Sequence, residues 1–172
     1  MAFNQHSGQI SFEDTLTHEQ QGSFLSGYST ILLPPGTELW RFVSRQGDNS
    51  FGAFWITPET MSALMQRLHY NNNFSQHNKK ENIKNSLAIL SGWSNVSWRV
   101  KVILTKEVTA YIGTTGPQAN FAKIENTSAF GGGEMHVKDE SRHGSSEQIV
   151  IPRFRGLPNS NQYGDVKVFV HI

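Results

Sequence analysis

The chain has 172 residues, of which 37% are apolar and 17% are charged. A chain of this length buries one core of ordinary size, so we expect a single folded domain. Its formal net charge is only +1, which disfavours nucleic acid as a partner because a polyphosphate backbone requires a strongly basic surface. No apolar run approaches the ~18 residues of a membrane-spanning helix, so we expect no membrane contact. The absence of cysteine removes disulfides, thiolate nucleophiles and cysteine zinc sites.

The first part of the chain differs in composition from the rest. Residues 1 to about 30 are rich in Gln, Ser, His and Gly and show no sustained hydrophobic period. That composition is typical of a polar lead-in that packs loosely or links to an upstream segment. We therefore expect a single domain at residues 31–172, with residues 1–30 as the lead-in.

Two strands are expected near the start of this domain. Pro34-Pro35-Gly36 is a turn, and the aromatic and branched residues 38–43 after it predict a strand. The turn-forming residues Gly47-Asp48-Asn49-Ser50 lead to a second expected strand at residues 51–56. We expect the two strands to form a hairpin with a loop longer than two residues.

Two short helices are expected next. Thr57 has the chemistry of an N-cap and Pro58 that of a first helical residue, and apolar residues follow at helical spacing: Met61, Leu64, Met65 and Leu68. A polar loop containing Lys79-Lys80-Glu81 is expected after this helix. A second short helix is expected to carry Ile83, Leu87 and Leu90 and to end at Gly92.

The rest of the chain is mainly of strand type. Apolar and polar residues alternate from Val96 to Leu104, and residues 108–112 continue in strand chemistry. Residues 113–133 are rich in Thr, Gly, Asn and Ala, and we expect a long, poorly ordered loop there. Residues 148–152 and 166–172 are expected as two closing strands. The predicted fold class is α+β, with a mixed, mainly antiparallel β core and two short helices.

Arg41 is the first candidate site residue. It alternates with Trp40 and Phe42, so it points to one side of a strand whose other side is aromatic. One hypothesis is a surface arginine whose stem lies on the sheet. The other is a guanidinium in a cleft, where its planar fork binds a phosphate or a carboxylate.

A glycine-rich segment and a later strand supply the other candidates. Gly131-Gly132-Gly133 is either a flexible linker or a place where a ligand approaches the backbone closely. Glu134 follows it, as a solvated carboxylate or as a site residue. Gln148 opens an apolar strand that ends at Pro152. That strand is either an ordinary edge strand or one that holds a carboxamide for a ribose hydroxyl.

The motifs of other enzyme classes are missing from the sequence. None of the seven histidines forms an H-x-x-x-H or H-E-x-x-H pair, so we do not expect a metal site. Gly113-Thr114-Thr115-Gly116 is not a P-loop because no Gly-Lys-Ser/Thr follows it. No G-x-S-x-G nucleophile elbow is present.

Taken together, several short segments resemble the catalytic domains of NAD-consuming bacterial toxins. These are the NAD glycohydrolases of the tuberculosis necrotizing toxin group and, more distantly, polymorphic toxins with the ADP-ribosyltransferase fold. The resemblance covers most of residues 34–152. The matching segments are Leu39-Trp40-Arg41-Phe42, Gly52-Ala53-Phe54-Trp55-Ile56-Thr57-Pro58, residues 108–113, Gly116-Pro117-Gln118, Gly131-Gly132-Gly133 and Gln148.

The resemblance implies an ADP-ribosyltransferase-like fold and cleavage of the nicotinamide–ribose bond of NAD, which is the substrate, without a metal. It implies Gln148, Arg41 and Glu134 as catalytic residues, with Gln148 or Glu134 at the ribose and Arg41 at the diphosphate. The implied NAD-contacting residues are Arg41, Phe54, Trp55, Thr57, Gly132 and Gly133. A cognate immunity protein and a secreted or delivered effector that acts in the cytoplasm of a target cell are implied in the same way.

Two departures from the family pattern leave the chemistry open. The family's glutamine almost directly follows the glycines, whereas Glu134 stands there in this chain and Gln148 comes later. The family's histidine has no clear counterpart, with His69 the candidate by order along the chain. The alternatives are therefore a mono-ADP-ribosyltransferase that modifies a protein or nucleic acid, an inactive relative that binds a partner, and a non-enzymatic β-rich binding module.

Overall fold

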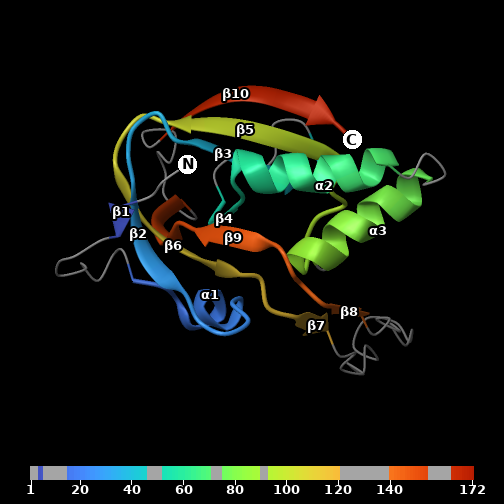
Figure 1. Ribbon diagram of the computed structural model, residues 1–172, viewed down its shortest axis with the longest axis horizontal. Helices are drawn as coiled ribbons and strands as arrows, with labels where there is room; N and C mark the ends of the chain where they lie inside the picture. The colour runs from blue at the N-terminus through green and yellow to red at the C-terminus, as the bar shows by residue number, and fades with distance from the viewer. Residues whose placement is uncertain are drawn as a thin grey trace, which may run out of the picture.

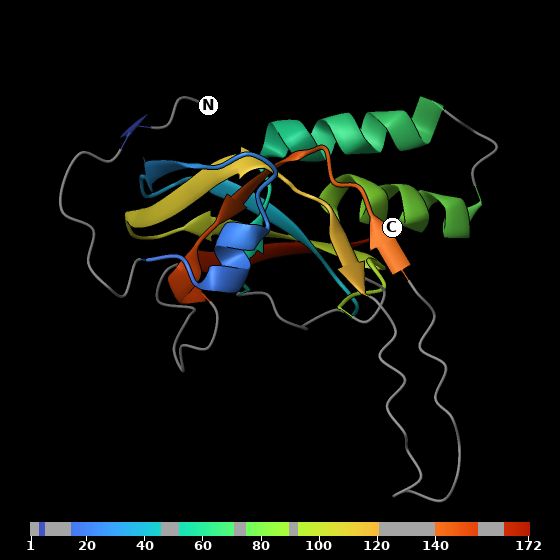
Figure 2. The same cartoon turned by 90° about the horizontal axis from the view of Figure 1, so that it is seen from below.

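The computed structural model describes residues 4–5, 15–45, 52–70, 75–89, 93–120, 140–154 and 164–172. Antiparallel β-sheets form its centre, and the helices α2 (Pro58–Tyr70) and α3 (Gln76–Leu87) lie next to each other along one flank (Figure 1; Figure 2). The predicted α+β class with a mainly antiparallel core is confirmed. Within the described ranges, no helix has the length and apolar character needed to cross a bilayer.

The larger sheet combines strands from distant parts of the chain. Its order is β1-β2-β6-β9-β4, and every neighbouring pair is antiparallel. Its members are β1 (Asn4–Gln5), β2 (Ser29–Leu33), β6 (Val108–Thr114), β9 (Glu147–Val150) and β4 (Phe54–Trp55). The short β4 therefore pairs with a strand from near the end of the chain, with Trp55 opposite Ile149.

A second sheet packs against the first. Its order is β10-β5-β3, formed by β10 (Gly164–His171), β5 (Trp98–Leu104) and β3 (Glu38–Val43). A separate two-stranded ribbon pairs β7 (Gln118–Asn120) with β8 (Glu140–Arg142). The closing strand expected at residues 166–172 is confirmed as β10, which begins two residues earlier than expected.

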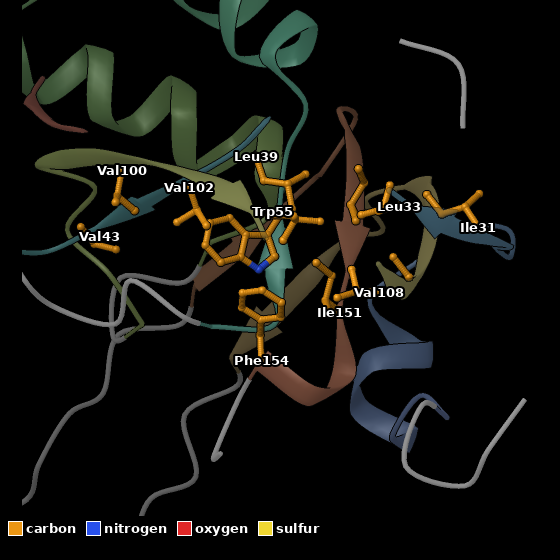
Figure 3. Close-up of a cluster of buried hydrophobic side chains, with 13 residues drawn as sticks. Ile31, Leu33, Leu39, Val43, Trp55, Val100, Val102, Val108, Ile151 and Phe154 are labelled. Atoms are coloured by element: carbon orange, nitrogen blue, oxygen red, sulfur yellow. The ribbon is translucent and has the colours of Figure 1, made fainter. Parts of the chain in front are cut away.

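The main core fills the space between the two sheets (Figure 3). The expected alternation in β5 is confirmed, because Val100, Val102 and Leu104 are all buried in this core. From the other sheet, Trp55 is 1% exposed, and its ring meets the edge of Phe154 at a centroid distance of 5.6 Å. Phe154 belongs to the 3-10 helix η3 (Pro152–Phe154), which ends the last described segment before β10.

Both predicted helices exist, and one starts earlier than expected. The Thr57 hydroxyl accepts a hydrogen bond from the Thr60 backbone N–H at 3.1 Å, which confirms the N-cap of α2. α3 begins after Ser75, whose hydroxyl caps it, so Lys79-Lys80-Glu81 lies inside a helix rather than in a loop. α3 ends where Ala88 adopts a left-handed conformation with φ 50°, before the expected stop at Gly92.

The expected hairpin between residues 38–43 and 51–56 is wrong. β3 pairs with β5 and β4 pairs with β9, so the two segments belong to different sheets. One isolated bridge between Trp40 and Ile56 joins them. The sheets thus meet at a corner at this bridge, and the same segment continues into α2.

Two expectations about irregular segments also need correction. Loose packing is wrong for the described part of the lead-in, because α1 (His18–Gly22) folds there and Phe24 is buried beside Tyr111. The boundary at residue 30 stays a prediction. The loop expected from residue 113 starts later, since β6 runs to Thr114 and β7 follows, and residues 121–133 lie outside the described residues.

Candidate functional site

Arg41 points inward, into the space between the two sheets. Its neighbours on the same side of β3 are Leu39 and Val43, both part of the main core. The centre of its guanidinium lies 5.6 Å from the centroid of the Trp55 ring, within the range of a cation–π contact. The side chain is half-buried, so the structure places it in the molecule rather than on the outer face of the sheet.

Gly52 fits closely against this guanidinium. A β-carbon at residue 52 would lie 1.4 Å from Nη1 and 2.3 Å from Cζ of Arg41. Gly52 is also bound to Trp55, because the Trp55 indole N–H donates a hydrogen bond of 2.7 Å to the Gly52 carbonyl. Gly52, Trp55 and Arg41 therefore form one compact unit at the corner of the two sheets.

The other residues expected to contact NAD from this segment lie in different environments. Trp55 is buried in the main core, whereas its neighbour Phe54 is half-buried on the opposite face of the sheet, beside a small cluster under α1. Thr57 is buried as the N-cap of α2. Of these three side chains, only that of Phe54 is partly exposed in this structure.

Gln148 lies on the face of the larger sheet that turns away from Arg41. It precedes Ile149, which faces the main core opposite Trp55, so its own side chain points to the other side. Its carboxamide N–H₂ donates to both the backbone carbonyl and the hydroxyl of Ser23, each at 3.0 Å. The structure therefore does not bring Arg41 and Gln148 together.

The remaining candidates are outside or on the edge of this arrangement. Gly131-Gly132-Gly133 and Glu134 lie outside the described residues, so the expected neighbourhood of Arg41 and Glu134 stays a prediction. His69 is exposed in the last turn of α2. No group of three or more His, Cys, Asp or Glu side chains that suits a metal ion occurs within the described segments.

The sequence did not reveal the charged cluster where α3 meets β8. The Arg142 guanidinium is buried and forms a 2.6 Å hydrogen-bonded ion pair with Glu81, and it also donates to the side-chain Oδ1 of Asn85 at 3.3 Å. The hydrogen bond from Arg142 holds the pKa of Glu81 below its ordinary value. Arg142 and Glu81 are far apart in the chain, so no local sequence pattern predicts their contact.

Backbone hydrogen bonds extend this cluster toward Gln148. The N–H of Gly144 donates to the Asn85 carbonyl at 2.8 Å, and the N–H of Ser145 donates to the Ser86 carbonyl at 3.0 Å. Gly144 has φ +65°, and a β-carbon there would lie 2.5 Å from the Thr115 carbonyl oxygen. The connection between β8 and β9 is therefore fixed between α3 and the end of β6.

The comparisons with known proteins show a fold likeness. No family model matches the chain, and no curated protein matches it. A solved structure of Rhs1-CT in complex with its cognate immunity protein RhsI1 matches with a TM-score of 0.50 and 16% identity, over 87% of this chain and 84% of that chain. A structure of Tne2 in complex with Tni2 matches with a TM-score of 0.49 and 18% identity, over 84% of this chain and 92% of that chain. At such identities the Rhs1-CT match shows that the two chains share a fold, which agrees with the α+β architecture described above.

Proposed function

We propose that this chain is a toxin-type enzyme that consumes NAD by hydrolysing its nicotinamide–ribose bond. The observation that carries the proposal is the placement of Arg41. This strand residue has its guanidinium turned between the two sheets and stacked on the buried Trp55 ring. A guanidinium turned into the molecule beside an aromatic ring is suited to binding an anion.

A guanidinium suits the diphosphate of NAD for geometric reasons. The guanidinium lies over the Trp55 ring at 5.6 Å, and its hydrogen-bond donors lie along its edge. Two such donors match two phosphate oxygens at once. Because Nε and Nη1 are buried in this structure, binding the diphosphate in this way requires that the guanidinium become accessible. Phe54 is half-buried next to Trp55 in β4, but on the opposite face of the sheet. We assign it to the nicotinamide end, which requires that NAD extend past the edge strand β4 from one face to the other.

The bond cleavage itself needs a polar group at the ribose. Nicotinamide departs with the electron pair of the bond to the ribose carbon, which leaves an oxocarbenium-like state, and a water oxygen then adds to that carbon and releases a proton. We assign the ribose contact to Gln148 or to Glu134. For Gln148 this role requires that Ser23 release its carboxamide, because Ser23 occupies both N–H donors. It also requires that NAD reach both faces of the sheet, because Gln148 faces away from Arg41.

The proposed biological setting follows from the same likeness. Rhs1-CT, which shares the fold, occurs in complex with a cognate immunity protein. A cell makes an immunity protein to neutralise its own toxin, so the match supports a toxin that is delivered to a target cell and acts in its cytoplasm. We propose a cognate immunity protein as the protein partner of this chain.

The distribution of exposed aromatic residues disfavours a binding module. A flat binding sheet requires several exposed aromatic residues on one face. Among the described residues, the exposed large apolar side chains lie in loops or at the end of α2: Leu25, Tyr28, Tyr70 and Trp93. The sheets therefore offer no aromatic binding face within the described part of the chain.

The deciding experiment follows nicotinamide release from NAD by the purified chain. We expect turnover, with free ADP-ribose as the product, and Arg41→Lys should raise KM more than it lowers kcat because lysine lacks the two-pronged geometry. ADP-ribose attached to a protein or nucleic acid would instead indicate the transferase alternative. A parent chain without turnover, or an Arg41→Lys variant indistinguishable from the parent, would overturn the proposal.

The two ribose candidates are separated by alanine variants. Loss of a well-placed polar group from the transition state costs about 10²-fold in turnover, so Gln148→Ala or Glu134→Ala should show that loss and the other should not. Ser23→Ala serves as the control for Gln148→Ala, since it removes one hydrogen-bond partner but keeps the carboxamide. A large loss in Ser23→Ala as well would indicate that Gln148 acts only by holding α1.

A further inference from the structure

We infer that Gly52 is a positioning residue for Arg41, and that Trp55 supports the guanidinium rather than contacting the substrate. The consequence for substrate binding rests on the proposed function, in which Arg41 holds the diphosphate. The contacts themselves do not depend on that function. They follow from the geometry at the corner where β3 and β4 meet.

The first step is the space that glycine leaves. A β-carbon at residue 52 would fall 1.4 Å from Nη1, 2.3 Å from Cζ and 2.6 Å from Nη2 of Arg41, all far inside van der Waals contact. The guanidinium thus occupies the volume of the missing side chain. Any residue other than glycine at this position must move the guanidinium.

The second step is the support from Trp55. Its ring is fully buried, so it has no surface to offer a ligand, and the guanidinium lies over it at 5.6 Å. Its indole N–H donates to the Gly52 carbonyl at 2.7 Å, which fixes the glycine relative to the ring. One side chain therefore holds both the guanidinium and the backbone segment that borders it.

The third step is the expected cost of changing Gly52. Its φ is not among the positive values of the described glycines, which belong to Gly27, Gly36 and Gly144, so alanine fits the backbone. The atoms that alanine would strike are the far end of a flexible side chain, which moves at little cost. Gly52→Ala should therefore displace the guanidinium while the protein stays folded and stable.

The experiment compares Gly52→Ala with Gly22→Ala. Gly22 is a matched control because a β-carbon there meets nothing within 4 Å and it lies in α1. We expect both variants to melt close to the parent. Gly52→Ala should raise the KM for NAD and the Kd for ADP, used as a diphosphate probe, by about tenfold or more, the scale of one charged hydrogen bond, with a much smaller change in kcat. Gly22→Ala should leave both constants unchanged.

A double-mutant cycle tests whether Gly52 acts through Arg41. In an Arg41→Ala background, Gly52→Ala should cause no further loss, because the group that it displaces is already gone. Additive losses, or a Gly52→Ala variant that binds ADP and NAD like the parent, would overturn the inference.

A spectroscopic readout keeps the inference separate from the proposed activity. The Nε–Hε resonance of Arg41 should be shifted by the ring current of Trp55 in the parent and should move toward its ordinary position in Gly52→Ala, with no shift change in Gly22→Ala. If the parent neither turns over NAD nor binds ADP but this resonance behaves as expected, the proposed function fails while the positioning geometry stands. An Arg41 resonance that is the same in the parent and in Gly52→Ala would disprove the geometry itself.

Discussion

The two faces of the larger sheet perform different tasks, although they share the same two short strands. On the inner face, Trp55 and Ile149 close the main core, and Trp55 also supports Arg41. On the outer face, Phe54 packs against a small apolar cluster and Gln148 is hydrogen-bonded to Ser23, which follows α1. Adjacent residues in a strand therefore belong to separate structural units, one built around an aromatic ring and a cation and the other around a carboxamide and a helix.

The largest effect should come from breaking the inner face. Trp55→Ala removes a fully buried ring that contacts Phe154 and supports Arg41, and we expect a loss of about 3–5 kcal/mol in the free energy of unfolding. Phe54→Ala, on the half-buried outer face, should lose about 1–2 kcal/mol. Urea denaturation measures both values, and equal losses would contradict the division between the two faces.

The second largest loss in the free energy of unfolding should come from removing the Gln148 carboxamide on the outer face. Gln148→Ala leaves the buried Ser23 hydroxyl without the N–H donor 3.0 Å away, and we expect a loss of about 1–3 kcal/mol. The double variant with Ser23→Ala should lose less than the sum of the two single variants, because both remove the same hydrogen bond. Strictly additive losses in chemical denaturation would show that the two side chains do not act together.

A smaller effect is expected away from the larger sheet, where Arg142 of the two-stranded ribbon pairs with Glu81 of α3. The pKa of folded Glu81 is below its ordinary value of 4.5 because Arg142 donates a hydrogen bond to it. This contribution to stability is therefore present above about pH 4.5 and is lost as the pH falls through the lower, folded-state value. We expect about 1 kcal/mol, since the Glu81 side chain is 33% exposed.

Glu81→Gln is the test of that pH dependence. The melting temperature should fall less steeply between pH 7 and pH 3 in the variant than in the parent, because the variant lacks the titrating carboxylate. Lys79→Gln, a charge change on the same helix, serves as the comparison and should keep the slope of the parent. Parallel curves for the parent and Glu81→Gln would contradict the assignment.

The smallest effect should come from Thr115, which follows the end of β6. Its hydroxyl is buried and has no hydrogen-bond partner among the described residues. Thr115→Val keeps the shape and removes a hydroxyl that gains nothing from burial, so we expect no loss and a gain of up to about 1 kcal/mol. A clear loss in urea denaturation would reveal a partner for that hydroxyl.

Local sequence patterns correctly predicted those helices and strands whose formation depends mainly on their own residues. The alternation in 98–104 predicted β5, and Thr57-Pro58 predicted the start of α2. The polar sequence of α3 hid its first turns, because that helix buries few apolar residues and is held by charged and polar contacts with β8. Sequence periodicity has no means of detecting such contacts.

The site was predictable only in part, for the same reason. Alternation with Trp40 and Phe42 correctly indicated that Arg41 points to the other side of β3. The expected hairpin failed because β4 finds its partner in β9, and that distant pairing decides which way Gln148 faces. The fit of Gly52 against Arg41 depends on two segments meeting at a corner, which no local pattern encodes.

The strand order also dictates when the molecule is able to fold. β9 stands between β6 and β4, so β4 has no ladder partner until the chain has been made as far as Val150. The hydrogen bond between Gln148 and Ser23 likewise forms only after 125 residues beyond Ser23 have been made. Strand pairs at such sequence separations form slowly, because closing the long loop costs conformational entropy before any contact between the strands contributes stabilising free energy. A ribosome that has made only the first two thirds of this chain therefore carries a larger sheet that still lacks β9 and β4, although β2 can already pair with β6 and β3 with β5. The sheet is completed only after Val150 has been made.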